Sequence, residues 1–327
     1  MTTSRIAVVL TTKRSRHGIK VHQILKAYQQ RGGDFKLIAV KGRIPLASEL
    51  CRLAHNYPQV DVMAAGGDGF HLMVNEEIEA LPPELRARFT LIPSPAGNAN
   101  DHFRARFGRW RSRTLRQQLR LALQLLDRGE RALVDVIRIK ADGLSFSALS
   151  YAGIGLTVRV AENINRRQYK LRHNAAGKLR NPPFKLLRQW WLESVAVAQE
   201  VWRAQPMRVE INGIEQSINS VTVHSIKAMA KVLCPNPHGD PADGQIEVLV
   251  CQAGRFNRCR VVLYMLRAIR GWLKPLLVGS DQEFKELTIR LLEPASLMRD
   301  GEPEAELPAN TVFVISCDHH GRSTLAA

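Results

Sequence analysis

Two glycine-containing loops, each between a short apolar run and a helical pattern, constrain the fold of this chain most. The first is Ala65-Gly66-Gly67-Asp68-Gly69, and the second is Pro95-Ala96-Gly97-Asn98-Ala99-Asn100-Asp101. Glycine lets backbone N–H groups approach an anion closely, and a helix N-terminus adds partial positive charge. Two strand–loop–helix units of this kind predict a phosphate-binding cleft. The carboxylate of Asp68 indicates chemistry or magnesium in addition to binding.

The composition is that of a basic globular protein. The chain has 327 residues, of which 45% are hydrophobic, and this length favours two domains. Its formal net charge of +17 favours anionic partners: nucleic acid, nucleotides or acidic lipid headgroups. No apolar stretch approaches the roughly 18 residues of a membrane span, and Ile6–Leu10 is too short for a signal-peptide core, so we expect a cytoplasmic protein. The five cysteines form no CxxC pair, which argues against a disulfide framework and a zinc site.

Strand-like and helical patterns alternate up to about residue 131 and change beyond it. The alternation predicts a parallel sheet wrapped by helices. Farther along, turn residues such as Ala141-Asp142-Gly143 join the apolar runs, which is typical of antiparallel hairpins. Strands are expected there at 133–140, 144–151, 207–211, 220–226, 245–250, 286–292 and 311–316, with helices within 178–201 and 257–272.

Three further motifs follow the two loops in a fixed order. They are Ser150-Tyr151-Ala152-Gly153-Ile154-Gly155, then Asp243-Gly244-Gln245-Ile246-Glu247-Val248 after Pro237, and finally Asp300-Gly301-Glu302. The ordered set resembles the diacylglycerol kinase catalytic-domain family, which also holds sphingosine kinases, ceramide kinases and bacterial lipid kinases. Gly-Gly-Asp-Gly alone is shared with sugar-phosphate and NAD kinases, whereas the five motifs together are specific to this family.

The resemblance implies an α/β nucleotide-binding kinase domain over residues 1–131 and an antiparallel β-sandwich, lipid-binding domain over 132–327. The active site would lie in the cleft between them, with ATP and Mg²⁺ as cofactors. Asp68 and Glu302 would be catalytic, and Asp243 would bind a structural magnesium. The implied nucleotide-binding residues are Gly66, Gly67, Gly69, Gly97, Asn98, Asn100, Asp101, Lys13, Arg14 and Ser15.

Each of these residues also has a structural interpretation. The glycines suit ordinary strand-to-helix turns, and Asp68, Asn100 and Asp101 suit helix caps. Glu302 suits an exposed hairpin, and Asp243 suits an Asp-Gly turn. These alternatives stay open from the sequence.

The chain also departs from the family pattern in its loops. Phe70 and Asn98 stand where the family has threonine, Met73 stands where it usually has glutamate, and Thr11–Gly18 replaces Asn-Pro-x-Ser-Gly. The lost hydroxyls remove donors to a phosphate, although the Asn98 amide and the charges of Lys13, Arg14 and Arg16 can compensate. A degenerate family member that binds nucleotide or lipid with little kinase activity is therefore the first alternative.

Two basic stretches contain aromatic residues. One surrounds Phe107 and Trp110 within 104–120, and the other is Arg166–Arg188, which runs into Trp190-Trp191. Cations beside tryptophan suit an anionic membrane interface, single-stranded nucleic acid, or a solvated face with the ring in the core. Because no nucleic-acid module signature is present, nucleic-acid binding is only a second alternative. The sequence predicts an ATP-dependent kinase of a lipid alcohol, peripheral at the cytoplasmic membrane surface.

Overall fold

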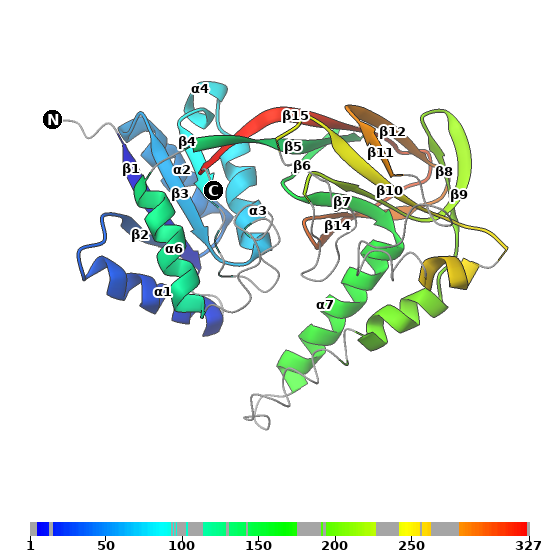
Figure 1. The fold of residues 1–327 in the computed structure, drawn as a ribbon, viewed down its shortest axis with the longest axis horizontal. Coiled ribbons are helices and arrows are strands. Elements are labelled where there is room, and N and C mark those ends of the chain that lie inside the picture. Colours follow the sequence, from blue (N-terminus) through cyan, green and yellow to red (C-terminus); the bar gives the residue numbers. More distant parts are fainter. Residues whose placement is uncertain are drawn as a thin grey trace.

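The computed structural model contains two β-sheets with helices around them (Figure 1). It describes residues 5–12, 16–92, 94, 96, 103, 114–128, 131–141, 143–174, 191, 194–226, 242–255, 257–262 and 281–325. Within this part of the chain no helix is both long enough and apolar enough to span a bilayer.

The first sheet is parallel and has the strand order β2-β1-β3-β4. Its strands are β1 (Ile6–Thr12), β2 (Lys36–Val40), β3 (Val60–Ala65) and β4 (Phe89–Ile92). The helices of this region are α1 (Arg16–Gln29), α2 (Arg43–Asn56), α3 (Asp68–Glu79), α4 (Pro83–Arg86) and α6 (Leu115–Arg128).

Helices cover both faces of this sheet. Successive side chains of a strand point to opposite faces, so the buried strand β3 contributes to two cores. Val62 and Ala64 share a core with residues of α2 and α3, while Met63 and Ala65 share the other with residues of α1 and α6. The predicted parallel α/β architecture is confirmed.

The second sheet is antiparallel, and its hydrogen-bonded path runs β14-β13-β7-β9-β8-β12-β15-β5-β6, with β10 joining β9 to β11. Its strands are β5 (Arg131–Ala141), β6 (Leu144–Ala148), β7 (Tyr151–Gly155), β8 (Met207–Ile211), β9 (Ile214–His224), β10 (Ile246–Gln252), β11 (Asp281–Phe284), β12 (Glu286–Leu291), β13 (Ala295–Arg299), β14 (Glu302–Leu307) and β15 (Val312–Leu325). Helix α7 (Leu156–Asn174) and helical residues 194–202 and 257–262 accompany it. The predicted antiparallel domain is confirmed.

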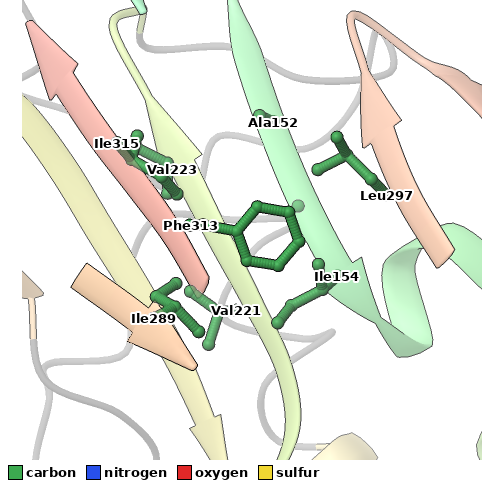
Figure 2. A pocket seen from close by; sticks show the side chains of 9 residues that line it. Ala152, Ile154, Val221, Val223, Ile289, Leu297, Phe313 and Ile315 are labelled. Atoms are coloured by element: carbon green, nitrogen blue, oxygen red, sulfur yellow. The ribbon is translucent and has the colours of Figure 1, made fainter. Parts of the chain in front are cut away.

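The sheet curls around an apolar core with a small cavity at its centre. Figure 2 shows Ile154, Val221, Ile289 and Phe313 around this space. The cavity measures about 10 Å³, which is about the room that one water molecule needs. An acyl chain therefore does not fit there, and the aliphatic lining stabilises the sheet.

The two regions are joined by a shared core and by the last strand. Val136 of β5 and Leu149 pack into the core formed by the first sheet with α2 and α3. The end of β15 pairs with the start of β5 beside β4, so the C-terminus returns to the first region (Figure 1). The division into 1–131 and 132–327 stays a prediction, because the terminal strand links both parts.

Candidate active site

The Gly-Gly-Asp-Gly loop lies where β3 ends and α3 begins. Gly67 is the N-cap of α3, and the amides of Phe70 and His71 donate to its carbonyl oxygen, both at 3.0 Å. Asp68 is the first helical residue, so the cap position belongs to Gly67 and not to Asp68. The first N–H groups of a helix have no acceptor within it, and the helix dipole is positive there. The loop therefore has the donors and polarity of an anion site.

Gly66 must be glycine for a steric reason. The ring of Phe70 folds back over it, and a Cβ on Gly66 would lie 2.5 Å from Phe70 Cδ1. Phe70 also packs against the apolar core under α3. The residue that replaces the family's threonine is thus a packing residue, and it provides no hydroxyl donor to the loop.

Glu302 reaches this loop from the other sheet. A Cβ built on Gly69 would lie 3.1 Å from Glu302 Oε1 and 3.5 Å from Glu302 Cγ. Gly69 follows Asp68 directly in the first turn of α3, while Glu302 begins β14. The structure therefore brings the late Asp-Gly-Glu motif to the early glycine loop, as we expected from the resemblance.

A tight turn presents Glu302. Asp300 and Gly301 have φ values of 47° and 87°, which is the pattern of a two-residue type I′ hairpin between β13 and β14. The nearly buried carboxylate of Asp300 accepts hydrogen bonds from the backbone amides of Leu149, Ser150 and Tyr151, at 2.9, 2.8 and 3.1 Å. These bonds fix the turn to the start of β7, so the two motifs form one structural unit.

Arg299 is a residue that the sequence analysis missed. It is 3% exposed, and its guanidinium contacts Glu76 of α3 at 2.7 Å and Glu304 of β14 at 2.6 Å. The same group donates to the backbone oxygen of Ser147 at 3.0 Å and lies 4.8 Å from the ring centroid of Phe146. The sequence feature that could have indicated its role is an arginine at the end of an apolar strand, directly before the Asp-Gly-Glu motif.

Asp243 has a turn role in the structure. Its Oδ1 accepts a hydrogen bond from the amide of Gln245 at 3.0 Å, and the amide of Gly244 donates to Asp135 at 2.7 Å. No group of three or more His, Cys, Asp or Glu in the described ranges could hold a metal ion. Magnesium binding by Asp243 stays a prediction.

Other predicted residues lie outside the described residues. They are Lys13, Arg14, Ser15, Gly97, Asn98, Asn100 and Asp101, together with most of the arginines around Trp110. The segments that hold them follow β1 and β4 directly. β1, β3 and β4 are parallel neighbours, so the described ends of β1 and β4 lie on the same side of the sheet as the end of β3.

The second basic stretch is described only at its start and end. Arg166 is exposed, whereas Arg167 is half-buried and donates to Asn163 at 2.9 Å and to Gln199 of the neighbouring helical segment. Trp191 is 64% exposed, so this ring does not lie in a core. Arg167 therefore connects α7 with the neighbouring helical segment. Its guanidinium is engaged within the protein, unlike a cation that faces a membrane.

The comparison with known proteins rests on the fold. The chain matches no family model and no curated protein. A solved structure of a protein assigned as a diacylglycerol kinase, from Bacillus anthracis str. Sterne, superposes with a TM-score of 0.68. The match has 16% identity and covers 100% of this chain and 99% of that chain. Two further structures from the same organism, also assigned as diacylglycerol kinases, have TM-scores of 0.66 and 0.65, each at 16% identity over 99% of this chain and 97% of theirs. The resemblance indicated by the five motifs is confirmed for the fold.

Replacing Asp300 should destabilise the protein strongly. Asp300→Ala leaves three backbone donors without their carboxylate acceptor, and a hydrogen bond to a charged group contributes about 1.5–3 kcal/mol. We expect the free energy of unfolding to fall by about 3 kcal/mol or more in urea titrations. Asp300→Asn keeps one acceptor oxygen and tolerates positive φ, so its loss should be smaller. Equal stability of all three proteins would contradict this account of the turn.

Gly69→Ala should separate folding from activity. Alanine favours a helix over glycine by about 1 kcal/mol, and the new Cβ meets only the movable end of Glu302. We therefore expect unchanged or slightly raised stability in thermal unfolding, together with a displaced Glu302 carboxylate and lower turnover. In a Glu302→Ala background the same substitution should have no further effect on turnover, because the contact is already absent.

Proposed function

We propose that this chain is an ATP-dependent lipid kinase that phosphorylates a hydroxyl group of a diacylglycerol-like or sphingoid lipid at an anionic membrane surface. The observation that carries the proposal is the approach of the Glu302 carboxylate to Gly69. A carboxylate from one domain thus lies at the start of a helix whose glycine loop suits a phosphate. The fold shared with the diacylglycerol kinase structures supports the same reaction class.

The glycine loop fits a nucleotide phosphate by its shape and its donors. Side chains are missing at Gly66 and Gly69, where a Cβ would meet Phe70 or Glu302 closely. Backbone N–H groups at the N-terminus of α3 can then contact phosphate oxygens, with the helix dipole adding favourable charge. Lys13 and Arg14, which follow β1 in the sequence, would add cations at the same sheet edge.

The donor set also fits a magnesium ion that arrives with the nucleotide. Mg²⁺ is usually held by one or two carboxylates together with phosphate oxygens and water, and Glu302 approaches Gly69, the residue that follows Asp68. Bound Mg²⁺ would neutralise the negative charge that develops on the transferred phosphoryl group. No ligand role for Asp243 is needed in this step.

Glu302 is the proposed acid–base residue. It lies on β14 in the second domain, where it would orient a lipid hydroxyl and accept its proton at a carboxylate oxygen. The hydroxyl oxygen would bond to the γ-phosphorus of ATP as the bond from that phosphorus to the bridging oxygen breaks and ADP leaves. Asp68, the first residue of α3, supplies the second carboxylate, which orients the hydroxyl or balances charge at the phosphates. Positioning and electrostatic stabilisation carry most of the catalysis in phosphoryl transfer.

One observation favours the alternative of a binding protein with little turnover. Phe70 covers Gly66 and packs into the core, so the loop lacks the hydroxyl that the family's threonine provides. A nucleotide would then depend on backbone donors and nearby cations. Tight ATP binding without transfer to any lipid alcohol would support this alternative.

The proposed reaction predicts a specific pattern in two variants. Phosphate transfer from labelled ATP to a lipid extract should yield a labelled lipid, and Glu302→Gln and Asp68→Asn should each reduce turnover about 10²–10⁴-fold. Both substitutions keep the side-chain shape while removing its charge. Nucleotide affinity should change little in Glu302→Gln, because the proposed phosphate cradle belongs to the first domain. Near-native turnover in both variants would contradict the catalytic assignment.

Membrane binding should depend on cations of the second basic stretch. Replacing Arg166, Lys170 and Arg172 by glutamine removes three charges, each worth about 1 kcal/mol near an anionic surface, so binding to phosphatidylserine vesicles should weaken about 100-fold at low salt. Arg167→Gln is the matched control, because this side chain is engaged with Asn163 and Gln199. Loss of binding to single-stranded DNA at physiological salt, with vesicle binding intact, would favour the nucleic-acid alternative.

A further inference from the structure

The β13–β14 hairpin touches helix α3 at two places. Glu302 lies at Gly69, and the buried Arg299 contacts Glu76. Gly69 and Glu76 are seven positions apart, or about two turns and 10.5 Å along an α-helix, so they share one helix face. The hairpin therefore contacts α3 at two points about two turns apart, with Glu302 toward the glycine loop.

The hairpin places its charged residues on the same side. Arg299 is paired directly opposite Glu302 across the Asp300-Gly301 turn. Glu304 lies two positions beyond Glu302 on β14, where the pairing with β13 shifts register. Arg299 contacts Glu304 at 2.6 Å and Glu76 at 2.7 Å, so a single guanidinium joins β14 to α3.

Arg299 is the fixed neighbour of Glu302 at this turn. Glu302 itself is exposed. Arg299 is 3% exposed, and the side chains of Glu76 and Glu304 are only 20% and 26% exposed. A buried guanidinium with two carboxylate partners has little freedom to move, because any shift leaves a charge unpaired.

We propose that Arg299 is a positioning residue, which bridges Glu76 and Glu304 and thereby holds Glu302 over the glycine loop. The inference rests on the proposed function and adds a determinant of turnover that lies outside the reacting groups. The planar guanidinium contacts both carboxylates through Nη2 and donates to the backbone oxygen of Ser147 through Nη1, whereas a lysine ammonium acts as a single point charge. The bridge therefore requires arginine, and its effect on catalysis passes through Glu302.

The test is a double-mutant cycle between Arg299 and Glu302. Arg299→Met should lower kcat about 10–100-fold with KM for ATP unchanged, since a misplacement of about 1 Å can have an effect of this size. In a Glu302→Gln background, Arg299→Met should cause little further loss, because its effect acts through that carboxylate. Arg299→Lys should be intermediate. Additive losses in the double variant would overturn the proposal.

Arg138 provides a matched control. It joins the same two domains through Glu79 of α3 at 2.7 Å and Asp318 of β15 at 2.6 Å, but it contacts neither strand of the hairpin in the described ion pairs. Arg138→Gln should lower thermal stability while its effect on kcat remains independent of Glu302. If Arg299→Met fails to fold, Glu304→Gln serves in its place, because it removes only the β14 end of the bridge.

Hydrogen exchange tests the positioning without any need for kinase activity. Backbone amides within residues 300–307 should exchange faster in Arg299→Met than in the wild type. In Arg138→Gln, these amides should exchange at the wild-type rate. Equal exchange in the wild type and Arg299→Met would overturn the proposal even if the wild type transfers no phosphate. An inactive wild type with the expected exchange pattern would instead count against the lipid kinase function alone.

Discussion

The carboxylate of Asp300 is the interaction on which the proposed site depends. It accepts three backbone hydrogen bonds from residues 149–151 in a buried position, and such bonds contribute about 1.5–3 kcal/mol each. By contrast, a contact made by the exposed side chain of Glu302 contributes little to stability. The hydrogen bonds of Asp300 fix the position of the turn. The weaker contact then places the Glu302 carboxylate, which is the proposed acid–base group. Stability and the proposed function are therefore assigned to two different residues of one motif.

Much of the fold could be predicted from the sequence, because local patterns determine it. The alternation of strands and helices predicted the parallel sheet. Leu119, Ala122 and Leu126 are buried on one face of α6 at helical spacing, which is a local pattern of this kind. The strand β9 was predicted from residue 220 but begins at Ile214, after a turn at Asn212 and Gly213 with φ of 48° and 82°. The return of β15 to the first domain was not predicted, since pairing between its end and β5 leaves no local pattern.

The site was predictable only in part, for the same physical reason. The meeting of Glu302 with the glycine loop followed from the order of the motifs in a resembling family, and no periodicity indicated it. The bridge from Arg299 to Glu76 joins residues 223 positions apart, and an ion pair at such a separation has no sequence signature. Arg167 lies in a basic stretch for which a membrane contact was predicted, and its hydrogen bond to Gln199, 32 positions away, likewise has no local pattern.

Phe70 packs into the apolar core directly beside the backbone N–H groups that suit an anion. Its ring covers Gly66 and enters the apolar core, so the start of α3 is held by hydrophobic contact where the family has a hydroxyl. Removing that hydroxyl leaves the backbone N–H groups and the helix dipole as the donors that the loop itself offers to a phosphate. These groups bind any tetrahedral anion of suitable size and do not distinguish the terminal phosphate from the others. In the proposed reaction, selection of the reacting phosphate would then rest on the carboxylate that the β13–β14 hairpin brings to Gly69.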